Sequence, residues 1–417
     1  MTMNWFNHAG LGLFVHWDHA SQQGLELSWP LVGRWRWPDD VSPDEYYSSA
    51  ATFNPVNWDA AELARRARAA GAKYVVFTAK HAAGYSMFHT KHSDFSIEHS
   101  PFRRDVTREL VDAVRAEGLR VGMYYSLSDW HHPDYPAFTE ADRPYAREDY
   151  RRATPEQWGR YLRHVHDQLT ELLTQYGQVD LLWFDGDWER TADEWRADQI
   201  RMLAKSLQPK VVINDRLPGH GDYVTPEQVM PIAPLPGPWE LCLTMSESWG
   251  YRPADRRRKS ARELAGYLCE VTSKGGNLLL NVGPDGDGTL PDWQIERLDA
   301  LTAWTKRHGE AVLGVRPGDA EVQFYGPVTQ RDDTVYLHLV LRPLGELVAR
   351  GLPVKRIRGV RLLATGEPLR FRTNVEVHHG VVPPEPTGEL FVEFPGDSGA
   401  LVDVIAVDLG AAGVDIQ

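Results

Sequence analysis

The stretch VDLLWFDGDWE, from Val179 to Glu189, decides how the chain folds. It is an apolar run of strand-forming residues that ends in a carboxylate, Asp185, followed by a glycine. Continuous apolar runs of this length are typical of parallel strands that are buried on both faces. An acid directly after such a strand has two explanations, because it either forms a turn or takes part in chemistry.

Six further runs have the same apolar character, and helix-like segments alternate with them from residue 11 to about 308. These runs are LGLFVHW (11–17), KYVVFTAKH (73–81), RVGMYYS (120–126), KVVINDR (210–216), WELCLTM (239–245) and NLLLNVG (277–283). The alternation favours a closed (β/α)8 barrel, and no Gly-x-Gly-x-x-Gly motif follows the first run to favour a dinucleotide-binding sheet. No eighth strand is obvious, and residues 217–238 show no helical pattern. We therefore expect an α/β fold built on an irregular TIM-like (β/α)8 barrel.

After residue 308 the pattern changes to short strands separated by Gly, Pro and Asp. These strands are EVQFYGPV (321–328), TVYLHLVL (334–341), RIRGVRLL (356–363), LRFRTNVEVHH (369–379) and ELFVEF (389–394). Regularly spaced short strands with turn residues between them are typical of an antiparallel β-sandwich. The expected organisation is a catalytic barrel over residues 1–314 and a C-terminal β-sandwich over residues 315–417.

The composition excludes several classes of partner. The chain has 417 residues, of which 42% are hydrophobic and 25% charged, and a net charge of −13. Nucleic acids and anionic membranes bind basic surfaces, so neither is expected as a partner. No apolar run is long enough to span a membrane, and the first residues do not resemble a secretory leader, so we expect a cytoplasmic protein. Two cysteines, Cys242 and Cys269, do not make a disulfide framework.

Polar and aromatic residues follow five successive runs at the same end. They are His16–Trp17, Lys80–His81, Tyr124–Ser126 with Asp129–Trp130 beyond, Trp183–Asp185, and Asn214–Arg216. Each case alone has an ordinary structural explanation, such as a loop histidine or an aspartate that caps the next helix. In a (β/α)8 barrel the active site lies at the carboxyl ends of the strands. The coincidence at five ends therefore predicts a site there.

The residue types indicate glycoside hydrolysis. The chain has no Gly-x-Ser-x-Gly elbow and no phosphate-binding loop, and the adjacent His131 and His132 point apart, so we expect no metal and no cofactor. Retaining glycosidases need two carboxyl groups about 5 Å apart, one as nucleophile and one as acid. Asp185, at the end of a rigid strand, is the expected nucleophile. The residues alone leave the acid open among four glutamates: Glu189, Glu227, Glu240 and Glu247.

Several motifs together resemble glycoside hydrolase family 29, the retaining α-L-fucosidases. They are GLFVHW, YVVFTAKH, MYYSLSDW, LLWFDG, INDR, GDYVTPEQ, SWGY and the long segment KGGNLLLNVGPDGDGTLPDWQIERL (274–298). The resemblance implies that Asp185 is the nucleophile and that Glu227 is the acid/base. It also implies a set of substrate-binding residues, namely His16, Trp29, His81, Tyr125, Trp183 and Arg216. The implied substrate is a terminal α-L-fucosyl group on an oligosaccharide or glycoconjugate, which is released by double displacement. Whether the chain forms a homo-oligomer is left open.

The sequence departs from the family at two places. The usual KHHDGF motif is KHAAGY here, so that Ala82 replaces the second histidine and Ala83 the acid. His131 or His132 is a speculative substitute for the lost histidine. The loop ELSWPLVG (26–33), which contains Trp29, resembles the subgroup that acts on branched α-1,3/1,4-fucosides. Two alternatives stay open: a glycosidase of different hexose specificity, and an inactive homologue that only binds carbohydrate.

Overall fold

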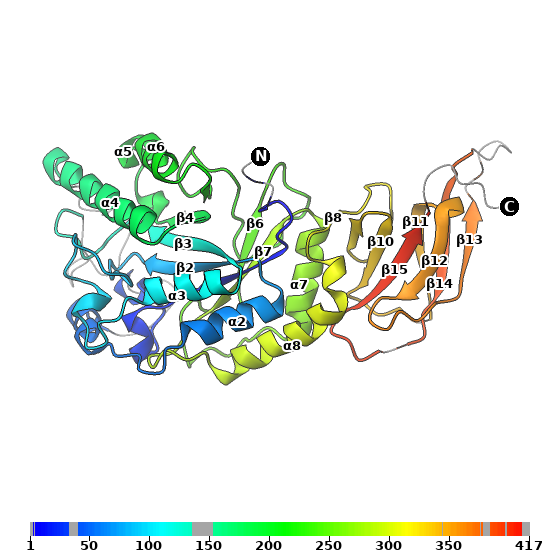
Figure 1. Ribbon diagram of the computed structural model, residues 1–417, viewed down its shortest axis with the longest axis horizontal. Coiled ribbons are helices and arrows are strands. Elements are labelled where there is room, and N and C mark those ends of the chain that lie inside the picture. The colour runs from blue at the N-terminus through cyan, green and yellow to red at the C-terminus, as the bar shows by residue number, and fades with distance from the viewer. Residues whose placement is uncertain are drawn as a thin grey trace.

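The computed structural model shows an α/β part followed by a β-rich part, which lie side by side along the long axis of the molecule (Figure 1). It describes residues 3, 5–32, 41–135, 153–343, 345–375, 377, 384–396 and 398–410. The predicted Trp29 lies within these residues, and of its loop ELSWPLVG (26–33) only Gly33 lies outside them.

Seven parallel strands form one curled sheet in the α/β part, and each of the seven apolar runs supplies one of them. They are β1 (Leu11–Val15), β2 (Tyr74–Lys80), β3 (Arg120–Ser126), β4 (Leu181–Asp185), β5 (Val212–Ile213), β6 (Glu240–Thr244) and β7 (Asn277–Val282). Their order in the sheet is β5-β4-β3-β2-β1-β7-β6. Nearly every residue of these strands is buried, which explains the continuous apolar runs.

An irregular segment, residues 222–228, fills the gap between the edge strands β5 and β6. Its backbone bonds to both edges, since Asp222 N–H donates to Ile213 O at 2.6 Å and Gln228 N–H donates to Cys242 O at 3.0 Å. It is not a regular strand, because Pro226 has no N–H to donate and Gln228 has a positive φ of 60°. This segment takes the place of the eighth strand, in agreement with the expected irregular barrel. It also carries Glu227.

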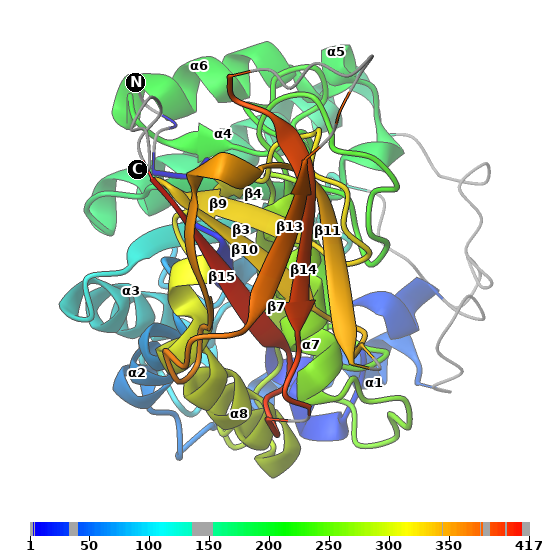
Figure 2. The ribbon, with the colours of Figure 1, turned by 90° about the vertical axis from the view of Figure 1, so that its right-hand side faces the viewer.

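Helices surround the sheet, as the view in Figure 2 shows. They are α1 (Pro43–Ser48), α2 (Ala60–Ala70), α3 (Val106–Ala116), α4 (Pro155–Gln175), α5 (Ala192–Trp195), α6 (Ala197–Leu207), α7 (Ala261–Ser273) and α8 (Asp292–His308). Helix α4 begins with a capping box between Thr154 and Gln157, and α2 ends at Gly71, whose φ is 98°. Within the described ranges, no helix combines the length and the apolar character needed to cross a membrane.

The C-terminal part contains two antiparallel sheets that enclose one apolar core. The larger sheet, in the order β12-β15-β10-β9-β8, consists of β8 (Arg316–Pro317), β9 (Val328–Arg331), β10 (Thr334–Leu339), β12 (Ile357–Leu362) and β15 (Asp403–Leu409). The smaller, in the order β11-β14-β13, consists of β11 (Glu346–Pro353), β13 (Phe371–Val375) and β14 (Thr387–Glu393). Leu337 of the larger sheet and Leu390 of the smaller lie in the same buried cluster. The predicted β-sandwich is confirmed, whereas the boundary between residues 314 and 315 stays a prediction.

Candidate active site

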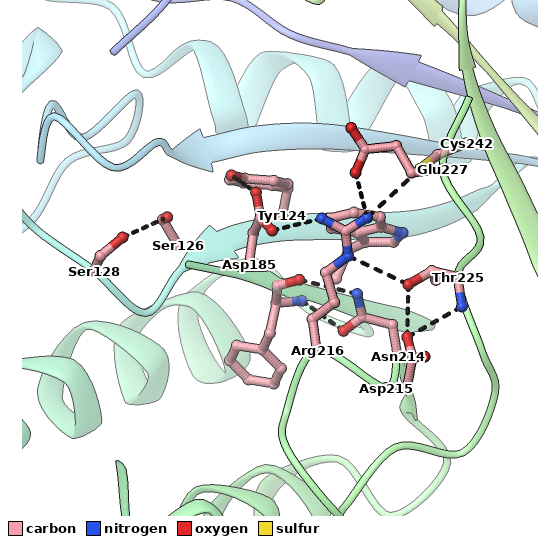
Figure 3. A network of polar contacts seen from close by, with 12 residues as sticks. Tyr124, Ser126, Ser128, Asp185, Asn214, Asp215, Arg216, Thr225, Glu227 and Cys242 are labelled. Atoms are coloured by element: carbon pink, nitrogen blue, oxygen red, sulfur yellow. Dashed lines mark hydrogen bonds and ion pairs between the residues drawn. The ribbon is translucent and has the colours of Figure 1, made fainter. Parts of the chain in front are cut away.

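Asp185 is fixed at the carboxyl end of β4 by two hydrogen bonds to its carboxylate. Oδ1 accepts from Nη1 of Arg216 at 2.7 Å, and Oδ2 accepts from the hydroxyl of Tyr124 at 2.7 Å (Figure 3). The residue is buried, and its backbone carbonyl accepts a hydrogen bond from Leu127 N–H. Both oxygens are therefore held in one orientation, on a strand that cannot shift without disturbing the barrel.

Arg216 joins Asp185 to Glu227. Its Nη1 donates to Asp185, and its Nη2 donates to Oε2 of Glu227 at 2.7 Å, while the guanidinium lies 4.5 Å from the ring centroid of Trp183. Burial by itself would lower the pKa of Arg216, but the two carboxylates outweigh it and raise that pKa well above the usual value. One guanidinium thus joins two carboxyl groups at the site, and a glycosidase needs such a pair.

Glu240, the second candidate acid, lies inside the barrel, where its carboxylate bonds to aromatic side chains. It is fully buried and accepts hydrogen bonds from Trp183 Nε1 at 3.0 Å and Tyr223 Oη at 3.3 Å, as well as from the Tyr74 hydroxyl. Burial raises the pKa of Glu240 to about 7, against the opposing effect of these donors. Glu240 therefore holds the indole of Trp183 in place from the interior of the barrel.

The remaining two candidates are engaged elsewhere. Glu189 accepts from Trp130 Nε1 at 3.0 Å and from the hydroxyl of Tyr135. Glu247 accepts from Nε of Arg257 at 2.7 Å on the surface. Among the four glutamates, Glu227 is the one that shares a cation with Asp185.

His81 reaches the site because β2 contains a bulge. Thr78 pairs with Tyr124 across the β2–β3 ladder, but Lys80 pairs with Tyr125, so the register shifts by one residue between Thr78 and Lys80. The shift turns Lys80 to the side of Tyr125, where its Nζ lies 4.3 Å from the ring centroid. His81 then faces the interior and stacks on Tyr124, with centroids 5.6 Å apart and planes 13° apart.

The ring of His16 lies beside His81 at a centroid distance of 6.1 Å. It also contacts Tyr124 at 5.5 Å and Trp249 at 4.9 Å. His16 and His81 are both buried, and burial is the largest cause that lowers the pKa of each, to about 4 for His81. Two neutral imidazoles with aromatic neighbours suit a site that binds hydroxyl groups.

The structure does not bring the predicted Tyr125 to this site. Its hydroxyl donates to Gln168 Oε1 of helix α4 at 2.8 Å, on the outer face of the sheet. Tyr124, which pairs in register with Trp183, contacts Asp185 instead. Adjacent strand residues point to opposite faces, and here both faces are buried, so an apolar run does not distinguish the two tyrosines.

The predicted Trp29 lies at the edge of the cluster. Its indole is half-buried, at 6.5 Å from His81, and stacks with Trp188 at 6.3 Å with planes 14° apart. Its neighbour Ser28 places Oγ 2.6 Å from Nδ1 of His81 and accepts from the N–H of Ala83 at 2.7 Å. The loop that carries Trp29 therefore supports His81 directly.

His131 and His132 do not replace the missing histidine at Ala82. The ring of His131 stacks on Phe95 at 4.1 Å, and Nδ1 of His132 accepts from the backbone N–H of Asp134. The acid in this region is Asp129. It is buried, and its Oδ2 lies 3.2 Å from Nζ of Lys80. This ion pair joins the end of β2 to the loop after β3.

Sequence reasoning missed three residues that form the site. Tyr124 and Trp249 line it, and Asn281 contacts His16 through Oδ1 at 2.7 Å. The pairing of β3 with β4 would have identified Tyr124, since it places Tyr124 beside Trp183. Trp249 and Asn281 belong to the motifs SWGY and NLLLNVG, and the sequence of these motifs does not single out either residue.

The site has two carboxyl groups joined by one arginine, and it has aromatic walls and a pair of histidines. It lies at the carboxyl ends of barrel strands. These features define a carboxylate-dependent glycoside hydrolase. The model of the α-L-fucosidase family matches residues 1–310. The chain belongs to this family, which is glycoside hydrolase family 29.

Curated relatives and solved structures agree with this assignment. Plasma alpha-L-fucosidase of Rattus norvegicus is 30% identical in an alignment of 410 positions that covers 89% of this chain and 84% of the relative. Alpha-L-fucosidase isoenzyme 1 from Paenibacillus thiaminolyticus is 34% identical, with a TM-score of 0.86 and 99% of each chain covered. A family 29 fucosidase from Bacteroides thetaiotaomicron, trapped as a covalent intermediate with 2-fluoro-fucosyl fluoride in a Glu-to-Gln mutant, is 26% identical with a TM-score of 0.82, over 98% of this chain and 96% of that one.

Proposed function

We propose that the protein is an exo-acting, retaining α-L-fucosidase in which Asp185 is the nucleophile and Glu227 the acid/base. The observation that carries the proposal is the pair of hydrogen bonds from Arg216, at 2.7 Å to each carboxylate. The two groups differ in environment, since the side chain of Asp185 is 12% exposed and that of Glu227 41%. A shielded nucleophile beside a proton donor open to water suits double displacement.

In the first step a carboxylate oxygen of Asp185 attacks the anomeric carbon of the fucosyl group. The bond from that carbon to the leaving oxygen breaks, and the leaving oxygen takes the proton of Glu227. The product is an ester between Asp185 and fucose. Arg216 and Tyr124, which hold the carboxylate before the attack, keep the attacking oxygen oriented.

In the second step Glu227, now a carboxylate, takes a proton from a water molecule. The water oxygen attacks the anomeric carbon, the ester bond breaks, and fucose leaves with retained configuration while the Asp185 carboxylate is regenerated. Glu227 then carries a proton again for the next cycle.

The walls of the site suit a deoxy sugar such as fucose, because this sugar carries a methyl group as well as hydroxyl groups. Trp183, Tyr124 and Trp249 supply apolar faces around the ring of Phe14, at 5.1, 6.0 and 5.9 Å from it. The neutral rings of His16 and His81 supply polar edges to the hydroxyl groups.

We also propose branched α-1,3/1,4-fucosides as the preferred substrates. The support is the ELSWPLVG loop, whose Trp29 stacks with Trp188 at the edge of the site, where a leaving-group sugar would lie. Comparison of kcat/KM for α-1,2-, α-1,3- and α-1,4-linked fucosyl oligosaccharides tests this preference. Equal or higher values for the α-1,2-linked substrate would overturn it.

The catalytic assignment is tested on an aryl α-L-fucoside with Asp185→Asn and Glu227→Ala. We expect each to lower kcat by about 10³-fold or more, and azide to restore turnover in Glu227→Ala. Glu247→Gln, a control at another candidate glutamate, retains activity. Near-wild-type turnover by Asp185→Asn overturns the assignment of the nucleophile. If the wild type hydrolyses other aryl hexosides but not the fucoside, only the fucose specificity is overturned.

A further inference from the structure

Asn281, in β7, makes two side-chain hydrogen bonds that fix its orientation. Its Nδ2 donates to the backbone carbonyl of Trp249 at 2.6 Å, and its Oδ1 lies 2.7 Å from Nδ1 of His16. A carbonyl oxygen only accepts hydrogen bonds, so the amide nitrogen of Asn281 must face Trp249. The amide oxygen must then face His16, and Nδ1 of that ring must carry a hydrogen.

The backbone of Trp249 is itself held in place. The buried carboxylate of Glu26 accepts from Trp249 N–H at 2.6 Å and from Gly250 N–H at 3.0 Å. The carbonyl to which Asn281 donates therefore belongs to a fixed piece of backbone. The orientation of Asn281 follows from the fold and does not depend on a bound ligand.

The orientation of Asn281 determines what His16 offers to the site. Burial is the largest cause that lowers the pKa of His16, and His81 and Arg216 act in the same direction, against the bond from Asn281, so the ring is neutral. A neutral ring with its hydrogen on Nδ1 has a lone pair on Nε2. Among the described residues, no hydrogen bond reaches this Nε2, and the neighbouring rings are those of His81, Tyr124 and Trp249.

We propose that Asn281 is a positioning residue that holds His16 in the Nδ1–H tautomer, so that the site accepts a hydrogen bond from a sugar hydroxyl at Nε2. The ligand class, a fucoside, rests on the proposed function, whereas the tautomer does not. The charged and titratable groups that face His16 are His81 from the end of β2, Tyr124 from β3 and Arg216 from the loop after β5. Within the part of the chain that the structure describes, none of them hydrogen-bonds to Nδ1, whereas Asn281 does, so Asn281 determines which nitrogen is protonated.

The chain offers a matched control four residues earlier on the same strand. Asn277 also makes two buried hydrogen bonds, accepting from Gly10 N–H at 2.8 Å and donating to Phe6 O at 2.6 Å. It lies at the opposite end of β7 from His16. The same substitution at Asn277 therefore removes equivalent contacts without affecting the histidine.

The experiment measures the tautomer directly by NMR of the full chain labelled with ¹⁵N in its histidine rings. The His16 signals are identified by their absence in His16→Gln. We expect an unprotonated Nε2 in the wild type and in Asn277→Ala, and an averaged or reversed pattern in Asn281→Ala. A protonated Nε2 in the wild type, or an unchanged pattern in Asn281→Ala, overturns the proposal whether or not the protein hydrolyses fucosides.

Kinetics on an aryl α-L-fucoside give the second readout. In Asn281→Ala we expect kcat/KM to fall on the order of 10-fold or more, with Asn277→Ala within about threefold of the wild type at temperatures where both are folded. Asn281→Asp keeps the acceptor and adds a negative charge, which favours the imidazolium, so the acid limb of its kcat/KM profile moves to higher pH. Equal losses in both alanine variants, or an unmoved acid limb in Asn281→Asp, contradict the proposal.

Discussion

Nη1 of Arg216 lies 2.7 Å from Oδ1 of Asp185, and the same guanidinium covers the face of Trp183 at 4.5 Å. This contact orients the proposed nucleophile, while the other terminal nitrogen of Arg216 holds Glu227. A planar group with two separate terminal donors can bond both carboxylates while its face stacks on the indole of Trp183. The geometry of the site therefore depends on arginine specifically, and not only on a positive charge.

Arg216→Lys tests this dependence. Lysine keeps the charge but presents a single ammonium group, so it cannot hold both carboxylates and stack on Trp183 in the same way. We expect kcat/KM for an aryl α-L-fucoside to fall on the order of 100-fold, with the fold retained by circular dichroism. A lysine variant with near-wild-type kcat/KM would show that charge alone suffices.

Tyr124 and Tyr125 provide a paired test of which face of β3 belongs to the site. Tyr124→Phe removes the hydrogen bond to Asp185 Oδ2 and is expected to lower kcat by about 10-fold. Tyr125→Phe leaves Gln168 without its donor and is expected to lower the free energy of unfolding by about 1 kcal/mol without changing kcat. Turnover and urea unfolding of both variants decide the matter, and the reverse pattern would place Tyr125 in the site.

Glu240 predicts a pH dependence of stability. Burial raises the pKa of Glu240 from an ordinary value near 4.5 to about 7, so between these values the folded chain holds a proton that the unfolded chain has lost. The contribution of Glu240 to the free energy of unfolding is therefore full below pH 4.5 and is lost as the pH rises to 7. Glu240→Gln removes this contribution and should flatten the decline in stability between pH 5 and 8.

The control for this measurement is Glu247→Gln. The pKa of Glu247 is lowered to about 2, mainly by the backbone N–H of Arg256 and by the side chain of Arg257, so it titrates below the range that is tested. Urea unfolding at pH 5, 6, 7 and 8 should give the wild-type slope in Glu247→Gln and a smaller slope in Glu240→Gln. Identical slopes in all three proteins would contradict the prediction.

The buried pair of Asp129 and Lys80 predicts a large loss of stability. Burial alone would raise the pKa of Asp129, but Lys80 and His164 lower it well below the usual range, so the carboxylate is charged. Asp129→Ala leaves the ammonium of Lys80 buried without its partner and should cost about 3–5 kcal/mol in unfolding free energy. Glu62→Ala, which breaks surface ion pairs with Arg65 and Arg66, should cost under about 1 kcal/mol, and similar losses in both variants would refute the distinction.

The strands of the barrel could be predicted because each is a local apolar run, and Asp185 could be predicted because it ends one of them. Tyr124 could not be separated from Tyr125, since helix α4 buries the outer face of β3 and hides the alternation. The bulge that turns His81 inward depends on pairing with β3, which one strand does not reveal. In the sequence, only the family resemblance distinguishes Glu227 from Glu240, because the contact of Glu227 with Arg216 arises only in the folded chain.

The segment that completes the barrel has a consequence for how the enzyme's preferences can change. Asp185 sits on a strand with a neighbour on each side, whereas Glu227 sits on residues 222–228, which connect to β5 and β6 through isolated bridges and have no helix of their own. Insertions or substitutions in this stretch can reorient Glu227, the proposed proton donor, and leave Asp185, the proposed nucleophile, in place on β4. The part of the site that carries Glu227 can therefore vary while the strand that carries Asp185 stays the same.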